Sequence, residues 1–181
     1  MIHHYQLFGL AIASEIELIG VPHVTSNAAP EVVIRRADLG GEADLRIEGV
    51  ASFRIADGCE VLVEAAPHAH PRNVQLYLLG TVVGRLLHQR GLLPLHADAL
   101  EIHRSAVAVL GSPGAGKSTL AASLHAAGAP LITDDLCAVR CVAGERPMVA
   151  PGLPRLRLWG DALDALQLRG RDARPAYAGA P

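Results

Sequence analysis

The sequence predicts an α/β protein in which a small β-rich N-terminal domain precedes a P-loop domain. The stretch from Ser105 to Thr119 leads an apolar run directly into GSPGAGKST. Residues 1–66 contain short strand-like segments separated by glycine turns. The chain of 181 residues is 50% hydrophobic but only 3% aromatic, a composition that suits a core of small aliphatic side chains.

The N-terminal segment reads as strands joined by turns. Phe53 and Ile55 alternate with Arg54 just before Asp57-Gly58, a strong hairpin signal. We expect an accessory or recognition domain over residues 1–70. The pairs His3-His4 and His68-His70 are candidate metal ligands, although isolated surface histidines explain them better. The expected strand segments are YQLFGLAIAS, VVIRRADL, LRIEG, ASFRIADG and CEVLVEA.

A helix that connects the two domains is predicted over residues 71–91. Leu76, Leu79, Val83 and Leu86 recur at helical spacing, and Gly91 ends the pattern. We expect this apolar face to pack against the nucleotide domain and to join the two halves of the chain.

Two adjacent strands are predicted to lead into the P-loop. The apolar runs LLPLHADALEI and AVAVL are separated only by His103-Arg104-Ser105. His96 stands inside the first run. Taken alone, a histidine in an apolar strand is most often a core residue whose hydrogen bonds are satisfied.

The segment GSPGAGKST fits the Walker A pattern G-x-x-x-x-G-K-[ST] between an expected strand and an expected helix. Its glycines allow backbone N–H groups to turn inward around a phosphate, and the helix N-terminus favours the same anion. Lys117 is the only lysine of the chain, and Ser118 is the expected ligand of Mg²⁺. A glycine-rich turn without a ligand is the alternative. The expected phosphate-binding residues are Gly111, Ser112, Pro113, Gly114, Ala115, Gly116, Lys117, Ser118 and Thr119.

Two carboxylates, Asp134 and Asp135, close the apolar segment Leu131-Ile132-Thr133. Buried unpaired charge is costly, and successive strand residues face opposite sides of a sheet. We therefore expect one carboxylate to face the ligand and the other to cap, orient or coordinate. A solvated acidic turn is the alternative for either residue.

The segment after the Asp pair is expected to continue as a strand over Cys137–Val142. If residues 155–158 are extended, Arg155 and Arg157 share one face, which suits a phosphate or an acidic acceptor, and a solvated strand face explains them equally well. A short helix is expected at Asp161–Leu168, followed by a flexible tail over residues 169–181.

Composition excludes several functional classes. The net charge of −2 and the pI near 6.5 give no basic field for nucleic acid or an anionic membrane. No signal-peptide pattern and no apolar run near the ~18 residues of a membrane span occurs. The three cysteines include no C-x-x-C pair, so we expect buried thiols rather than disulfides or zinc ligands, and a cytoplasmic protein.

The segments LPLHADAL, GSPGAGKST and LITDDLCAV together resemble the catalytic core of HPr kinase/phosphorylase, a bacterial P-loop protein serine kinase. They are closer still to HPr-kinase-like proteins, some of which phosphorylate precursor peptides of natural-product pathways. The resemblance implies a P-loop kinase core of the HPr kinase C-terminal type over residues 92–168, short of some family elements. It also implies ATP and Mg²⁺ as cofactors, a protein or peptide acceptor with a Ser or Thr hydroxyl, and self-association.

The resemblance assigns a role to each matching residue. Lys117 matches the phosphate-binding lysine, Ser118 the magnesium-binding serine and His96 the family histidine. Asp135 matches the proton acceptor for the attacking hydroxyl, and Asp134 its partner, with orientation or water-mediated metal contact as its role.

The sequence departs from the family after the Asp pair. APGLPRLRLW has no acid where the family carries a metal-binding glutamate, and Arg155 or Arg157 is the candidate substitute for a family arginine from a later basic loop. A nucleotide-binding regulatory or scaffold module, and a small-molecule kinase or NTPase, are the alternatives.

Overall fold

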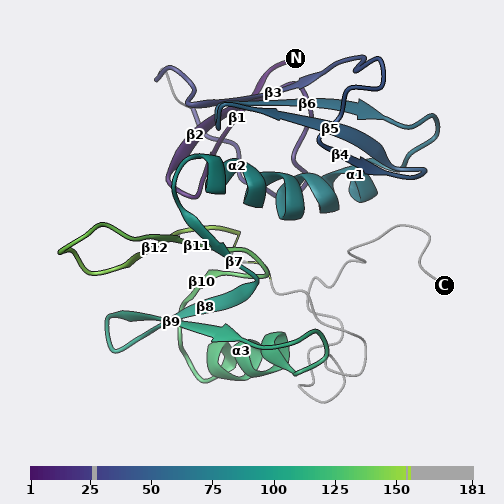
Figure 1. Ribbon diagram of the computed structural model, residues 1–181. Helices are drawn as coiled ribbons and strands as arrows, with labels where there is room; N and C mark the ends of the chain where they lie inside the picture. Colours follow the sequence, from purple (N-terminus) through teal and green to yellow (C-terminus); the bar gives the residue numbers. More distant parts are fainter. Residues whose placement is uncertain (26–27, 154, 156–181) are drawn as a thin grey trace. The chain divides into compact units, whose positions relative to one another are not determined.

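The computed structural model describes residues 1–25, 28–153 and 155 (Figure 1). The chain divides into two compact units, the first containing Met1–Leu92 and the second beginning at Leu93. The fold is mixed α/β with more strand than helix, so the predicted class is confirmed at this level. The predicted connecting helix falls within the first unit.

The first unit is built on a six-stranded sheet, which confirms a β-rich N-terminal region. Its strand order is β1-β2-β3-β6-β5-β4. The pairs β2–β3 and β3–β6 are parallel, and the other neighbours are antiparallel. The strands are β1 (His3–Leu7), β2 (Leu10–Ser14), β3 (Val32–Arg36), β4 (Leu45–Ile47), β5 (Ala51–Ala56) and β6 (Glu60–Ala65).

Left-handed turn residues close two hairpins of this sheet. Asp57 and Gly58, with φ of 51° and 64°, join β5 to β6, as their sequence predicts. Phe8 and Gly9, with φ of 53° and 78°, join β1 to β2 in the same way. The expectation of a single strand over YQLFGLAIAS is therefore wrong, because its apolar run conceals a turn that contains a phenylalanine.

One long helical segment lies along one face of this sheet (Figure 1). It comprises α1 (Pro71–Tyr77), the π-helical η1 (Leu78–Val82) and α2 (Val83–Gln89). The wider π turn shifts the phase of the 3.6-residue repeat, so Val74, Leu78 and Val82 are buried while Leu76 is only half-buried. The helix itself is as predicted, but Leu76 does not lie in its buried face.

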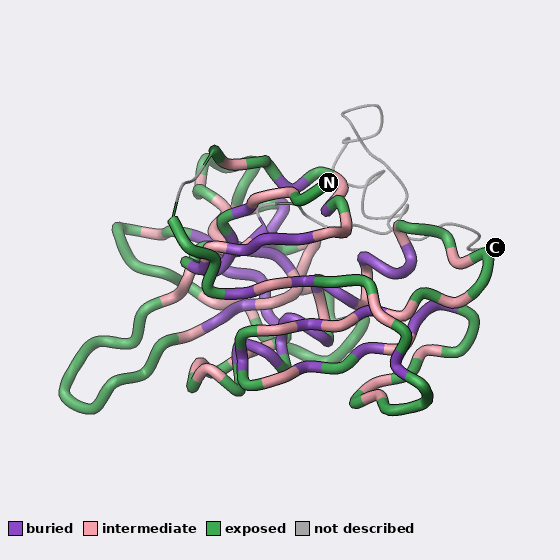
Figure 2. Tube along the Cα trace, turned by 90° about the horizontal axis from the view of Figure 1, so that it is seen from above, coloured by how far each residue is buried: buried purple, intermediate pink, exposed green. Residues whose placement is uncertain are grey.

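Alternating burial shows how the sheet and the helix form one core. Along β5, Ala51, Phe53 and Ile55 are buried and alternate with more exposed residues. Figure 2 shows short buried stretches interrupted by exposed ones along the traced chain. The Gln75 side chain on α1 accepts a hydrogen bond from Ile19 N–H at 2.8 Å and donates one to Ile19 C=O at 2.8 Å. This amide therefore joins the loop after β2 to the helix.

The second unit contains two three-stranded antiparallel sheets, with orders β10-β8-β9 and β12-β11-β7. Helix α3 packs against β8 and β9, on the side of their sheet opposite β7 and β11 (Figure 1). The elements are β7 (Leu93–Leu95), β8 (Ala97–Ile102), β9 (Ser105–Leu110), α3 (Lys117–Ala126), β10 (Leu131–Thr133), β11 (Cys137–Arg140) and β12 (Met148–Ala150).

The hairpin of β8 and β9 confirms the predicted pair of adjacent strands. It turns at His103 and Arg104, whose φ angles are 49° and 61°, and its register pairs Ala97 with Leu110. The first apolar run is interrupted, however, because it forms β7 and β8 with His96 at the bend between them.

The two faces of β8 have different environments. Ala97 and Ala99 form a small buried cluster with Cys137. Asp98 and Leu100 occupy alternate positions, which puts them on the side of the sheet where α3 lies.

Several expectations concern residues outside the described part of the chain. These are Arg157, the short helix at Asp161–Leu168 and the tail at 169–181. Within the described part, no helix is long and apolar enough to cross a membrane. Cys59, Cys137 and Cys141 are free thiols, but only Cys137 is buried, so the expectation of buried thiols is wrong for the exposed Cys59 and Cys141.

The turn glycine Gly58 provides a test of the first unit. A Cβ at Gly58 would lie 2.8 Å from Cγ of Arg90, whereas a Cβ at Gly49 would meet nothing within 4 Å. Both glycines have a positive φ, of 64° and 68°. We expect Gly58→Ala to lower the free energy of unfolding by about 2–4 kcal/mol and Gly49→Ala by about 1–2 kcal/mol, as measured by urea denaturation. Equal losses would contradict the contact with Arg90.

Candidate P-loop site

The P-loop has the strand, loop and helix context that its sequence predicts. β9 ends at Leu110, and α3 begins at Lys117. Gly114 and Gly116 have φ of 81° and 83°, a region that side chains disfavour. A Cβ at Gly111 would lie 3.2 Å from Cβ of Ala115, so the loop closes tightly on its first residue.

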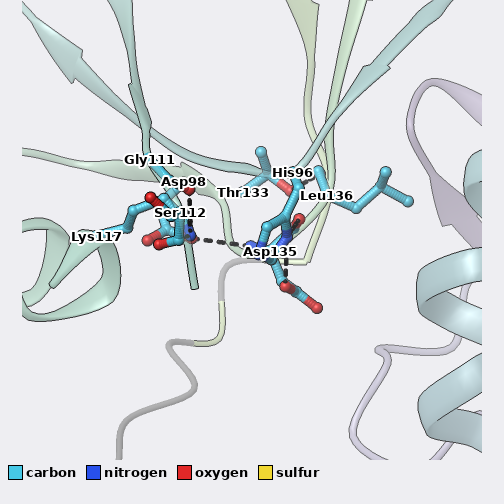
Figure 3. Close-up of polar contacts among 8 residues, drawn as sticks. All are labelled: His96, Asp98, Gly111, Ser112, Lys117, Thr133, Asp135 and Leu136. Carbon is cyan, nitrogen blue, oxygen red and sulfur yellow. Dashed lines mark hydrogen bonds and ion pairs between the residues drawn. The ribbon is translucent and has the colours of Figure 1, made fainter. Parts of the chain in front are cut away.

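Lys117 lies along the loop rather than extending into solvent (Figure 3). Its Nζ donates hydrogen bonds to Gly111 C=O at 2.9 Å and to Ser112 C=O at 3.3 Å. An ammonium has three N–H donors, so one remains for a further acceptor. The side chain is thereby held at the loop, with its positive charge next to the backbone of Gly111 and Ser112.

His96 lies next to the start of the P-loop because of the β8–β9 register. The last ladder pair joins Ala97 to Leu110, and the next residues along the two strands are His96 and Gly111. The histidine side chain is 58% exposed, so the interpretation of His96 as a core residue is wrong.

His96 and Asp135 form a pair held by two contacts (Figure 3). His96 Nδ1 lies 3.0 Å from Oδ1 of Asp135 and 3.0 Å from its backbone oxygen. Both partners are acceptors, so Nδ1 must carry the hydrogen. Nε2 is then the basic nitrogen of the neutral ring, and it bonds no other residue that the structure describes.

The two aspartates lie in the turn that follows β10 and have different environments. Thr133 Oγ1 donates to Leu136 C=O at 2.8 Å across this turn, and Asp135 has a φ of 66°. Asp134 is only 6% exposed, whereas the side chain of Asp135 is 31% exposed. A solvated acidic turn is therefore wrong for Asp134. The two carboxylates therefore differ in burial.

Asp98 is a third carboxylate at this site, and the sequence analysis did not identify it. It is 1% exposed, and its Oδ1 accepts a hydrogen bond from Asp135 N–H at 2.9 Å. Oδ2 is buried and has no hydrogen-bond partner among the described residues. A signal was present in the sequence, because Asp98 follows His96 by two positions and such residues share a strand face.

The neighbouring thiol is not a nucleophile candidate. Burial, and secondarily the negative charge of Asp98, raise the pKa of Cys137 above its usual value. Cys137 is fully buried in the cluster with Ala97 and Ala99, so it remains a protonated core side chain at neutral pH.

The remaining predicted site residues are distributed as follows. Ser118 and Thr119 occupy the first turn of α3, directly after Lys117. Arg155 is exposed, and Arg157 lies outside the described residues. Across residues 1–25, 28–153 and 155, no group of three or more His, Cys, Asp or Glu side chains is arranged to hold a metal ion.

No protein-family model matches the sequence, and comparisons with the curated proteins and with the solved structures gave no match. The resemblance to HPr kinase therefore rests on the three motifs quoted above.

The tautomer of His96 is a direct test of its pairing with Asp135. In a histidine side chain free in water the hydrogen prefers Nε2, so a neutral ring with the hydrogen on Nδ1 reports the two contacts. We expect ring ¹⁵N spectra at alkaline pH to show Nδ1–H for His96 and a reduced preference in Asp135→Ala. The ring signals that disappear from the spectrum of His96→Gln are those of His96. A dominant Nε2–H form in the wild type would contradict the pairing.

Proposed function

We propose that this chain is an ATP-dependent kinase of HPr-kinase-like type that transfers the γ-phosphate to a Ser or Thr hydroxyl of a protein or peptide. The observation that carries the proposal is the position of the His96–Asp135 pair at the first residue of the P-loop. A P-loop alone indicates phosphate binding, whereas a paired carboxylate and imidazole beside it adds a group that can accept a proton.

Nucleotide binding is assigned to the loop and to Lys117. Inward backbone N–H groups and the N-terminus of α3 suit the β- and γ-phosphates. The Lys117 ammonium, held by Gly111 and Ser112 C=O, is already at the loop and does not have to be ordered on binding.

A magnesium ion fits this site as a companion of the nucleotide rather than as a resident of a protein cage. The described residues form no cluster of three protein ligands, and Mg²⁺ commonly uses one or two protein oxygens plus phosphates and water. Ser118 Oγ, in the first turn of α3, would be its protein ligand, and a water-mediated contact is assigned to Asp134. When bound, the ion neutralises charge on the phosphates.

Asp135 is assigned as the proton acceptor of the attacking hydroxyl. The acceptor oxygen forms a bond to the γ-phosphorus as the bond from phosphorus to the bridging oxygen of ADP breaks, and the hydroxyl proton passes to the carboxylate. The His96 Nδ1–H group orients that carboxylate, and Nε2 remains for contact with a phosphate oxygen or the acceptor.

A nucleotide-binding regulatory module with little turnover is the second candidate. One observation favours it: between Leu136 and Arg155 the only acidic residue is Glu145, which is exposed. The glutamate that HPr kinases use as a further metal ligand therefore has no evident counterpart in this stretch.

The need for a lysine at position 117 can be tested by measuring nucleotide binding. Arginine is larger and planar, and cannot reproduce the point contacts of the ammonium with two loop carbonyls. We expect Lys117→Arg to weaken ATP·Mg²⁺ binding about tenfold or more by calorimetry, since hydrogen bonds of charged groups contribute about 1.5–3 kcal/mol. Arg104→Lys, in the exposed β8–β9 turn, is the matched control and should bind normally. Equal affinities for Lys117→Arg and the wild type would refute the assignment.

Transfer itself is tested with radiolabelled ATP and a degenerate peptide library that carries one fixed central serine or threonine. We expect label in peptides with the wild type, and a loss of about a hundredfold or more in Asp135→Asn with ATP affinity retained. ATP binding without any transfer would favour the regulatory module. Equal label with wild type and Asp135→Asn would reject Asp135 as the proton acceptor.

A further inference from the structure

We propose that Asp98 is a positioning residue whose buried carboxylate holds the backbone of Asp135 and thereby sets the His96–Asp135 pair beside the P-loop. The catalytic consequence rests on the proposed kinase function, but the geometry can be tested without it. Asp98 lies 37 positions from Asp135 in the sequence and contacts it directly. No motif of the sequence analysis assigned it a role.

The carboxylate of Asp98 is buried at a cost in stability. A carboxylate that is 1% exposed, with one oxygen lacking any described hydrogen-bond partner, destabilises the fold. Leu100, the next residue on the same face of β8, is also fully buried but apolar. A buried carboxylate at this position lowers the stability of the fold, so its presence points to a functional role.

The buried carboxylate of Asp98 accepts a hydrogen bond from the backbone N–H of Asp135. Asp135 has a φ of 66°, a left-handed conformation that L-residues adopt only at some cost in free energy. Its N–H donates to Oδ1 of Asp98 at 2.9 Å, while the Thr133 hydroxyl closes the turn by donating to Leu136 C=O at 2.8 Å. Asp98 thus supplies a long-range contact to the backbone of this left-handed residue, in addition to the contacts from His96.

The backbone of Asp135 also affects the position of the His96 ring. His96 Nδ1 contacts both the carboxylate and the backbone oxygen of Asp135, so it depends on the side chain and on the backbone orientation of one residue. A change of φ or ψ at Asp135 displaces at least one of these acceptors. Asp98 therefore contacts Asp135, and Asp135 in turn contacts the His96 ring (Figure 3).

Hydrogen exchange at the Asp135 amide tests the geometry directly. Asp98→Ala removes the acceptor, so the Asp135 amide should exchange about tenfold faster or more by NMR, relative to amides of the β8–β9 ladder. Asp98→Asn keeps an amide oxygen that can accept the same bond, and should retain most of the protection. The Nδ1–H preference of His96 should fall in Asp98→Ala and persist in Asp98→Asn.

A matched control separates positioning from a general loss of stability. Asp44 in the first unit also accepts a backbone hydrogen bond, from Ile55 N–H at 2.7 Å, so Asp44→Ala removes the same kind of contact elsewhere. With the peptide library, we expect Asp98→Ala to lower kcat about tenfold or more with the KM for ATP unchanged, and Asp98→Asn to restore most of kcat. Asp44→Ala should change neither value.

The outcomes are distinguishable. Unchanged exchange at the Asp135 amide in Asp98→Ala, or an equal loss of kcat in Asp44→Ala, would overturn the positioning role. Failure of Asp98→Asn to restore protection and kcat would also overturn it, because the hydrogen-bond acceptor would then not be what matters. A wild type that transfers no phosphate would reject the kinase proposal, while the exchange and tautomer results would still decide the role of Asp98.

Discussion

The antiparallel ladder between β8 and β9 is the constraint on which the candidate site depends. It pairs six residues of each strand and ends with Ala97 opposite Leu110, immediately before the P-loop. Side chains alternate along a strand, so a slip of one residue would move Asp98 from the α3 side to the opposite face. Ala97 and Ala99 resist that slip, because they are fully buried against Cys137. Packing of small apolar side chains on one face therefore determines where the polar groups lie on the other.

Small side chains also account for the compactness of this unit. Ala121 and Ala122 are the buried residues of α3, and the strands that it covers are rich in alanine and valine. Short side chains at such contacts allow close packing without large voids. A bulkier core would separate α3 from β8, and the start of α3 is where Lys117 and Ser118 lie. The aromatic-poor composition is thus consistent with a site that needs a helix N-terminus close to a strand end.

Features that local chemistry determines could be predicted from the sequence. The Asp57–Gly58 hairpin, the glycines of the P-loop and the strand that precedes it all follow from turn preference and residue type. The turn at Phe8 could not be predicted, because tertiary packing overrides the poor preference of a buried phenylalanine for positive φ. The contact of Asp98 with Asp135 joins residues 37 positions apart, and no local pattern specifies such a bond.

The Asp pair shows where strand alternation does not apply. Strand alternation was expected to separate the two carboxylates, yet both residues follow β10 in a turn, and the left-handed backbone of Asp135 separates them instead. Alternation of side chains along a strand costs no free energy, whereas an aspartate with a left-handed backbone needs stabilising contacts. Here these contacts are the hydrogen bond to the buried carboxylate of Asp98 and the turn closed by the Thr133 hydroxyl. A stability-driven sequence would place glycine or asparagine at such a turn and an apolar residue at position 98. The retention of two carboxylates and an imidazole at this point therefore favours a chemical role over a structural one.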